Sequence, residues 1–340
     1  MRHINIPVFI PHLGCPNQCV FCNQRTISGV SRFKIENVRN TIENAISTIP
    51  ENCQVEIAFF GGSFTGIDRD LMINLLEIGK EYIDKGLVTS MRCSTRPDYI
   101  DDEILSILKK YGVRTIELGL QSSSDNVLEM SKRGHCFDDE VSACKKIIDY
   151  GFNLVGQMMI GLPGSSPADE IETAEFIITS GAKAARIYPT VVFRDTELFA
   201  LTEIGEYSPL SVEDAVVRTT AVYKKFIEAN VDVIRIGLCS SENLASDETY
   251  FAGPNHSAIG ELVENQLYLE KTQEKLESMQ VRDNDMIIVS TAKGCLSKAI
   301  GQKKKNKFLL MATYSLRDIK FRENVELSGY EVSVEVERKK

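Results

Sequence analysis

Short apolar segments alternate with amphipathic helical segments along the first 200 residues of this 340-residue chain. Residues 35–49 show the helical pattern, because isoleucine and valine recur there every three or four positions. Residues 154–160 show the strand pattern, a short apolar run closed by Gly161. Six such units follow one another, an order that requires parallel strands joined by right-handed crossovers. The pattern predicts an α/β fold, a TIM-like partial (β/α)6 barrel with its functional loops at the carboxyl ends of the strands.

The pattern changes after residue 193. Long helical segments at 210–229 and 258–279 flank a short strand at 231–236. The remaining tail predicts strands at 286–289, 308–313, 319–322 and 332–336, with one helix at 296–300. We therefore expect a barrel core at 1–200, an extension of that core at 201–280, and a small basic β-rich unit at 281–340, so that the region after the core is a small α+β extension.

Composition and charge limit where the chain works. No run approaches the roughly 18 apolar residues of a membrane helix, so no membrane association is expected. Nine cysteines without an export signal indicate a reducing cytoplasm. The net charge is −9, yet residues 293–340 hold twelve Lys or Arg against six Asp or Glu. A localised contact with an anionic partner is therefore open to this end of the chain.

Three cysteines lie within eight residues, at Cys15, Cys19 and Cys22. Iron–sulfur clusters usually take four cysteine ligands, so a cluster held here would keep one iron open for a substrate or cofactor. The alternative is a structural zinc knuckle, with His12 or a distant cysteine as the fourth ligand. A disulfide framework does not suit a long chain of cytosolic character.

Glycine or polar residues close the strands that follow. A glycine pair lets a backbone approach a ligand closely, an arginine pairs with a carboxylate through two hydrogen bonds, and a glutamine both donates to and accepts from hydroxyl groups. These candidates are Gly61, Gly62 and Ser63 after the second strand, Ser94 and Arg96 after the third, Gln121 and Arg133 after the fourth, Gln157 on the fifth, and Arg186 with Tyr188 on the sixth.

The cysteine spacing, the aromatic Phe21 before the third cysteine and the order of these motifs resemble the radical S-adenosylmethionine (SAM) superfamily. The resemblance implies a [4Fe-4S] cluster on the three cysteines, with SAM bound to the open iron and cleaved to a 5′-deoxyadenosyl radical. It also implies that the Gly61–Ser63 loop receives the methionine amino group, although the family commonly has Glu where this chain has Ser63. The implied cofactor-binding set is Phe21, Gly61, Gly62, Ser63, Ser94, Arg96, Gln121, Arg133 and Gln157.

Several motifs resemble the radical SAM half of the catalytic subunit of Elongator, over about residues 5–270. They are STRPDYI at 94–100, ELGLQS at 117–122, RGH at 133–135, MMIGLPG at 158–164 and RIYPT at 186–190. That family modifies wobble uridines of tRNA and consumes acetyl-CoA. This chain has a shorter first cysteine interval, and about 70 residues after position 270 are too few for an acetyltransferase domain. The resemblance makes tRNA or another RNA a candidate substrate without carrying over the acetyl-CoA reaction.

The resemblance also implies a flavodoxin or ferredoxin as electron donor. The basic segment 293–307 is suited to gripping an RNA backbone, but it contains no aromatic residue for base stacking. Two other functions stay open at this point. One is a radical SAM oxidoreductase acting on a small molecule such as a porphyrinogen, and the other is a non-enzymatic zinc-knuckle RNA-binding protein.

Overall fold

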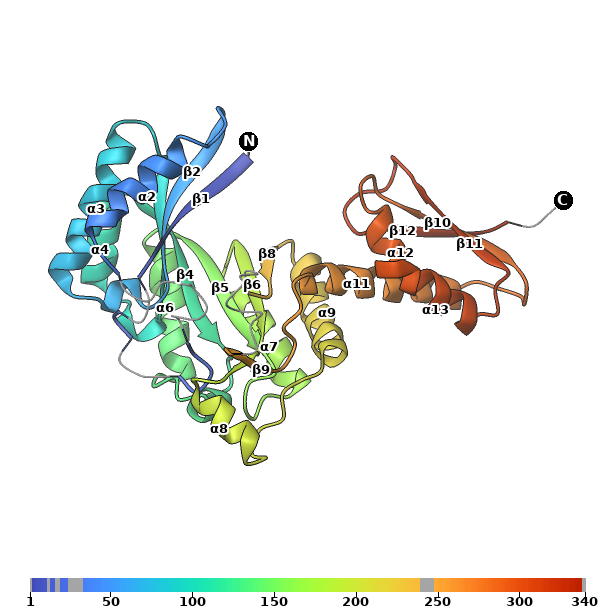
Figure 1. Ribbon diagram of the computed structural model, residues 1–340. Coiled ribbons are helices and arrows are strands. Elements are labelled where there is room, and N and C mark those ends of the chain that lie inside the picture. Colours follow the sequence, from blue (N-terminus) through green and yellow to red (C-terminus); the bar gives the residue numbers. More distant parts are fainter. Residues whose placement is uncertain (1, 11–12, 16–18, 24–32, 239–247, 338–340) are drawn as a thin grey trace. The chain divides into compact units, whose positions relative to one another are not determined.

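A computed structural model describes residues 2–10, 13–15, 19–23, 33–238 and 248–337. The chain divides into two compact units. The first comprises residues 1–211 and 225–257, and the second comprises residues 212–224 and 258–340. Figure 1 shows the chain coloured along its sequence.

The first unit is built on a curled sheet of seven strands, all paired in parallel. The strand order in space follows the order in the sequence: β1 (Arg2–Phe9), β2 (Cys53–Phe60), β3 (Ser90–Thr95), β4 (Val113–Gln121), β5 (Asn153–Ile160), β6 (Ala184–Pro189) and β8 (Asp232–Ile236). The predicted α/β half-barrel is thus confirmed, and the strand expected near 231–236 adds a seventh member beside β6.

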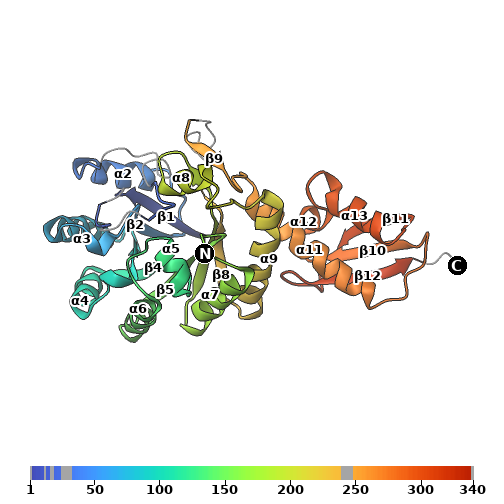
Figure 2. The ribbon, with the colours of Figure 1, turned by 90° about the horizontal axis from the view of Figure 1, so that it is seen from below.

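Helices cover the outer face of this sheet, as Figure 2 shows. They are α2 (Glu36–Ile46), α3 (Arg69–Asp84), α4 (Asp102–Tyr111), α6 (Phe137–Asp149) and α7 (Pro167–Thr179). The sequence sets their ends locally. Asp101 accepts a hydrogen bond from the Ile104 backbone N–H at 2.7 Å and caps α4, and Gly112 ends that helix in the left-handed region at φ 93°. Shorter elements of the unit include α5 (Asp125–Met130), α8 (Glu197–Glu203), the 3-10 turns η1 (Phe64–Gly66) and η2 (Pro97–Tyr99), and the antiparallel pair β7 (Val192–Phe193) and β9 (Tyr250–Ala252).

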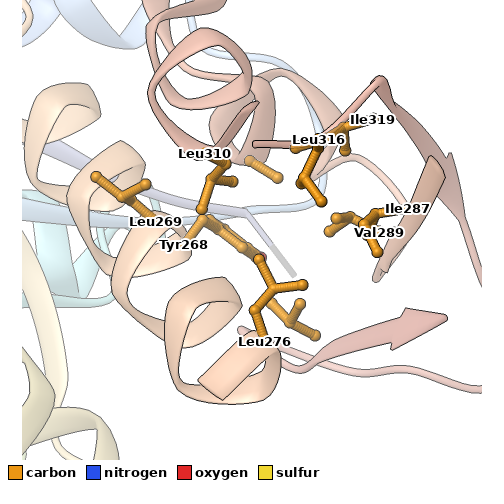
Figure 3. Close-up of a cluster of buried hydrophobic side chains, with 10 residues drawn as sticks. Tyr268, Leu269, Leu276, Ile287, Val289, Leu310, Leu316 and Ile319 are labelled. Atoms are coloured by element: carbon orange, nitrogen blue, oxygen red, sulfur yellow. The ribbon is translucent and has the colours of Figure 1, made fainter. Parts of the chain in front are cut away.

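The second unit contains a three-stranded sheet in the order β11-β10-β12. Strand β10 pairs in parallel with β11 and antiparallel with β12. Its elements are most of α9 (Val212–Glu228), α11 (Ile259–Glu277), β10 (Met286–Thr291), α12 (Leu296–Ile300), α13 (Lys305–Thr313), β11 (Asp318–Glu323) and β12 (Val332–Glu337). Figure 3 shows an apolar core of this unit, with Tyr268 of α11, Ile287 of β10 and Leu310 of α13 fully buried.

One predicted strand is wrong. Residues 308–313 belong to helix α13. A short apolar run fits a buried strand or a helix equally well, and contacts distant in sequence decide between them. Here the side chain of Asn306 is buried and donates to the carbonyls of Asn265, at 2.7 Å, and Ala299, at 3.2 Å, which holds the first turn of α13 in place.

No helix among the described residues is both long and apolar enough to cross a membrane.

Candidate active site at the carboxyl edge of the barrel

The cysteine segment lies against the loop that follows β2. Gly14 has φ +76°, and a Cβ on it would lie 2.3 Å from the carbonyl oxygen of Ser63. A Cβ on Gly66 would lie 2.4 Å from the carbonyl oxygen of Gly14. Only glycines allow these two backbones to touch, so the contact presses Cys15 onto the loop. The backbone of Ser63 hydrogen-bonds Cys15.

Two buried arginines surround the second cysteine. Cys19 is 6% exposed, Arg133 Nη1 donates to its Sγ at 3.2 Å, and Arg96 Nη1 lies 3.9 Å from the same atom. Burial raises the pKa of the Cys15 thiol, while the Ser63 backbone and both guanidinium groups act against that rise. The site therefore offers cationic donors to thiolate ligands in a place with little water, which is what an anionic metal–thiolate centre requires.

Neighbouring groups fix both arginines. Arg96 binds the Asp98 carboxylate through Nε at 2.8 Å and Nη2 at 3.1 Å, and it also donates to the carbonyl of Arg133. Arg133 Nη2 donates to the Gly119 carbonyl at 2.6 Å. The buried Nε of Arg133 has no protein partner among the described residues. It is an orphaned donor at the edge of the site, as a residue awaiting an anionic cofactor would show.

The third cysteine follows directly. Cys22 is half-buried, and its backbone N–H donates to the Cys19 carbonyl at 3.0 Å. Phe21 packs against the apolar cluster formed by Val20, Val192, Leu198 and Tyr207. Among the described residues, no three metal-binding side chains are already gathered around one point. Residues 16–18 between Cys15 and Cys19, and His12, lie outside the described part, so the ligand set stays a prediction.

The side chains of Gln121 and Arg133, both predicted site residues, lie close to Gly119. A Cβ placed on Gly119 would lie 2.9 Å from Gln121 Nε2 and 3.5 Å from Arg133 Nη2. Gln121 itself has φ 77°, and the β4–β5 register shifts just before it. A non-glycine residue in the left-handed region at a β-bulge re-aims its side chain at a cost of strain, a combination found at functional sites.

Three other predicted site residues, Ser63, Ser94 and Gly61, lie in different surroundings. Ser63 is fully buried, and its Oγ lies 3.5 Å from the Thr95 hydroxyl, so this side chain belongs to the wall of the site. Ser94 is half-buried on β3, in register with Glu117 of β4. Gly61 adopts φ 99°, a turn that favours glycine where the chain leaves β2.

A charged network fills the barrel interior, and the sequence analysis missed it. Arg92 joins Glu56, at 2.9 Å, to Glu117, at 2.7 Å. Arg186 binds Glu117 at 2.8 Å, and its guanidinium lies 5.6 Å from the centre of the Phe60 ring. The network thus runs from β2 to β6 across the interior. The signal in the sequence was a charged residue inside each of four otherwise mostly apolar strands, Glu56 in β2, Arg92 in β3, Glu117 in β4 and Arg186 in β6.

Gln157 belongs partly to this network, because its Nε2 donates to Glu117 at 3.1 Å. Its amide oxygen has no protein donor within the described ranges. The amide N–H of Gln157 is thus used by Glu117 of the neighbouring strand β4.

His135 is a second residue that the sequence analysis left without a role. Its side chain is fully buried, and its Nε2 lies 3.0 Å from Oε1 of Glu140. Burial, together with Arg133 and Arg96, lowers the pKa of His135 to about 4, while burial raises the pKa of Glu140. The imidazole is therefore neutral near pH 7, packed behind the Asp98 carboxylate that fixes Arg96.

Comparison with known families decides what this edge of the barrel is. Residues 9–177 match the model of the Radical SAM superfamily, and residues 182–268 match that of the Radical_SAM C-terminal domain. The chain belongs to the radical SAM superfamily. Members of this superfamily are enzymes that bind a [4Fe-4S] cluster and SAM, and the buried Cys19 thiol, its cationic donors and the orphaned Arg133 Nε suit both groups.

Relatives connect this radical SAM chain with Elongator proteins. An uncharacterized protein of Methanocaldococcus jannaschii is 31% identical over 60% of this chain and 66% of its own length. The tRNA uridine(34) acetyltransferase of the same organism is 30% identical over 56% of this chain and 34% of its own length. The solved structure of archaeal Methanocaldococcus infernus Elp3 aligns with a TM-score of 0.61 at 20% identity, over 80% of this chain and 63% of that chain, and shows the shared fold. The chain thus spans from about a third to about two thirds of these relatives.

Proposed function

We propose that Cys15, Cys19 and Cys22 hold a [4Fe-4S] cluster at the carboxyl edge of the barrel and that the chain uses it to cleave SAM reductively. The observation that carries the proposal is the pair of buried guanidinium groups on the buried Cys19 thiol. A structural zinc knuckle does not need an unpaired cationic N–H, such as the Nε of Arg133, beside its thiolates. The carboxylate of a cofactor can accept a hydrogen bond from such a group.

The remaining predicted residues divide the work of holding SAM. The turn at Gly61 and Gly62 offers backbone carbonyls to the amino group of SAM. Arg133 and Arg96 offer positive charge to its carboxylate, and Gln121 and the amide oxygen of Gln157 offer partners to the ribose hydroxyls. Phe21, Ser63 and Ser94 shape the wall against which the cofactor packs.

Bound together, the cluster and SAM supply a 5′-deoxyadenosyl radical, with the electron delivered by a flavodoxin or ferredoxin. The residues of the chain bind, orient and shield this chemistry. The network of Glu56, Arg92, Glu117 and Arg186 fills the barrel interior below the site, so a substrate reaches the site from the carboxyl edge. Exclusion of water at that edge protects a reactive radical.

We propose tRNA or another RNA as the substrate. Support comes from the related archaeal tRNA uridine(34) acetyltransferase and from the basic segment 293–307 of this chain. No disulfide joins any of the described cysteines, which suits a reducing cytoplasmic setting for such an enzyme.

The first test is made on anaerobically purified protein. We expect brown protein with iron and sulfide, which forms 5′-deoxyadenosine from SAM and a reductant. Cys19→Ala should abolish both properties, and the matched control Cys53→Ala, a half-buried cysteine at the start of β2, should retain them. Colourless protein with stoichiometric zinc would contradict the proposal. Comparison of modified nucleosides in bulk tRNA, with and without the gene, tests the substrate class.

A further inference from the structure

The second unit contains an open cavity of about 510 Å³ along β11, an edge strand of its sheet, which lines the cavity with successive residues from Asp318 to Arg322. We call its four apolar lining residues the floor: Ile288, Ile300, Ile319 and the half-buried Phe321. Ile319 belongs to the hydrophobic core of the unit, and Phe321 packs against that core. The two acidic residues in its lining are already paired, Asp318 with Lys307 at 2.7 Å and Glu337 with Lys320 at 3.2 Å. Two lysines of the same cavity lining therefore neutralise both acidic side chains.

Cationic charge is left over at the rim. Lys304 lines the cavity, and Lys303 and Lys305 flank it in the chain. All three side chains are exposed, and within the described ranges none of them contacts an acidic group. The apolar floor and the cationic rim are complementary to a nucleobase with its phosphates, and successive lysines extend the positive charge along more than one phosphate.

The loop that presents these lysines is held firmly. Gly301 packs so closely on Asn306 that a Cβ there would lie 2.9 Å from Asn306 Oδ1, and the buried Asn306 is in turn bonded to α11 and α12 through backbone carbonyls. The lysine side chains thus leave from a fixed backbone, which reduces the entropy lost when a ligand binds.

We propose that this cavity binds a single-stranded segment of RNA, with a base packed on Phe321 and phosphates on Lys303, Lys304 and Lys305. The proposal rests on the proposed function for the class of substrate, and it names the surface that grips that substrate. The aromatic residue that segment 293–307 lacks is supplied by β11, a strand adjacent to the segment in space.

The test uses the full-length protein and a short fluorescein-labelled oligouridylate, followed by fluorescence anisotropy at several salt concentrations. The triple variant Lys303→Asn, Lys304→Asn, Lys305→Gln removes the rim charge. Lys303 and Lys304 have φ 51° and 62°, and asparagine tolerates this left-handed region, so the fold is expected to survive. We expect at least about a tenfold loss of affinity and a salt slope smaller by about two, since each phosphate contact on a single strand contributes roughly 0.7.

A second variant, Phe321→Leu, tests the base contact. It should weaken oligouridylate binding by about fivefold or more, because stacking on an aromatic ring contributes roughly 1–3 kcal/mol per base. Binding of heparin, a polyanion without bases, should not change. The matched control is Lys275→Gln, an exposed lysine of α11 outside the cavity lining, which should bind RNA as the unaltered protein does.

Three results would overturn the proposal: a triple variant that binds RNA normally, an equal effect of Phe321→Leu on heparin, or polyglutamate binding as tight as RNA binding. The last would indicate an acidic protein partner. SAM cleavage without RNA should be the same in all these variants. Failure of SAM cleavage in the unaltered protein would contradict the proposed function and leave the RNA measurement standing.

Discussion

Glu117 carries the central position of the buried network, and its replacement by glutamine gives the sharpest test of the fold. Its side chain is 1% exposed and accepts from Arg92, Arg186 and Gln157. In Glu117→Gln, Arg92 keeps Glu56 as a partner, whereas Arg186 loses its only acidic partner among the described residues. Removal of one member of a buried ion pair costs about 3–5 kcal/mol, because the other charge stays buried without compensation.

That cost is large against the roughly 5–15 kcal/mol by which a folded domain is stable. For a unit of this size it corresponds to a fall in melting temperature of roughly 6–20 °C. Thermal unfolding followed by circular dichroism measures it on the same protein preparation. The control is Glu81→Gln, which breaks the Arg39–Glu81 pair at 2.7 Å, where both side chains are 45% exposed. Water and salt screen an exposed ion pair, so this variant should melt close to the unaltered protein and well above Glu117→Gln.

A double variant, Glu117→Gln with Arg186→Met, separates the ion pair from other effects of the mutation. It removes the uncompensated charge, so part of the lost stability should return. Two results would refute this reasoning. The first is a Glu117→Gln variant that melts no lower than Glu81→Gln. The second is a double variant that melts lower than Glu117→Gln by as much as Arg186→Met alone lowers the melting temperature of the unaltered protein.

Three further predictions concern the site. Gly14→Ala should reduce the iron content sharply, because its Cβ would lie 2.3 Å from the Ser63 carbonyl oxygen. The control Gly86→Ala has a similar φ of +70° but open space around its Cβ, so it should retain the iron. Equal iron content in the two variants would contradict this prediction. In thermal unfolding, Gln121→Gly should be at least as stable as the unaltered protein, because glycine relieves about 1 kcal/mol of strain in the left-handed region. Gln121→Ala keeps that strain and should be less stable than Gln121→Gly. The reverse order of stability would show that the backbone at position 121 is not strained. The folded-state pKa of His135, about 4, lies below its unfolded value of 6.5. Between these two pH values the unfolded chain binds a proton that the folded chain does not. About 3 kcal/mol of the free energy of unfolding, present above pH 6.5, should therefore be lost as the pH falls toward 4. Denaturant titrations at pH 7 and pH 5 should show a smaller pH dependence in His135→Gln, and an unchanged dependence would remove His135 as its source.

Much of the barrel could be predicted from the sequence, because its signals are local. Strand and helix periodicity placed the first six parallel strands, whose order in the sheet follows the order in the sequence. The parallel order also implied that the cysteine segment and the glycine loop share one edge. The contact of Gly14 with Ser63 shows them together.

The second unit shows where local signals fail. Residues 308–313 are apolar over a length that suits a strand, yet the buried Asn306 and its bonds to Asn265 and Ala299 place them in a helix. Phe321 and Lys304 line the same cavity although they are seventeen residues apart, which is equally non-local.

The sequence by itself determined the class of fold, the family and the order of the candidate site residues, because periodicity, caps and motif spacing are properties of neighbouring residues. Only the tertiary structure decided that Arg96 and Arg133 converge on Cys19, that Gln157 is held by Glu117, and that charges from four strands fill the barrel interior. Those contacts join residues 25 to 114 positions apart. Their geometry depends on the curl and register of the sheet, which no local pattern in the chain encodes.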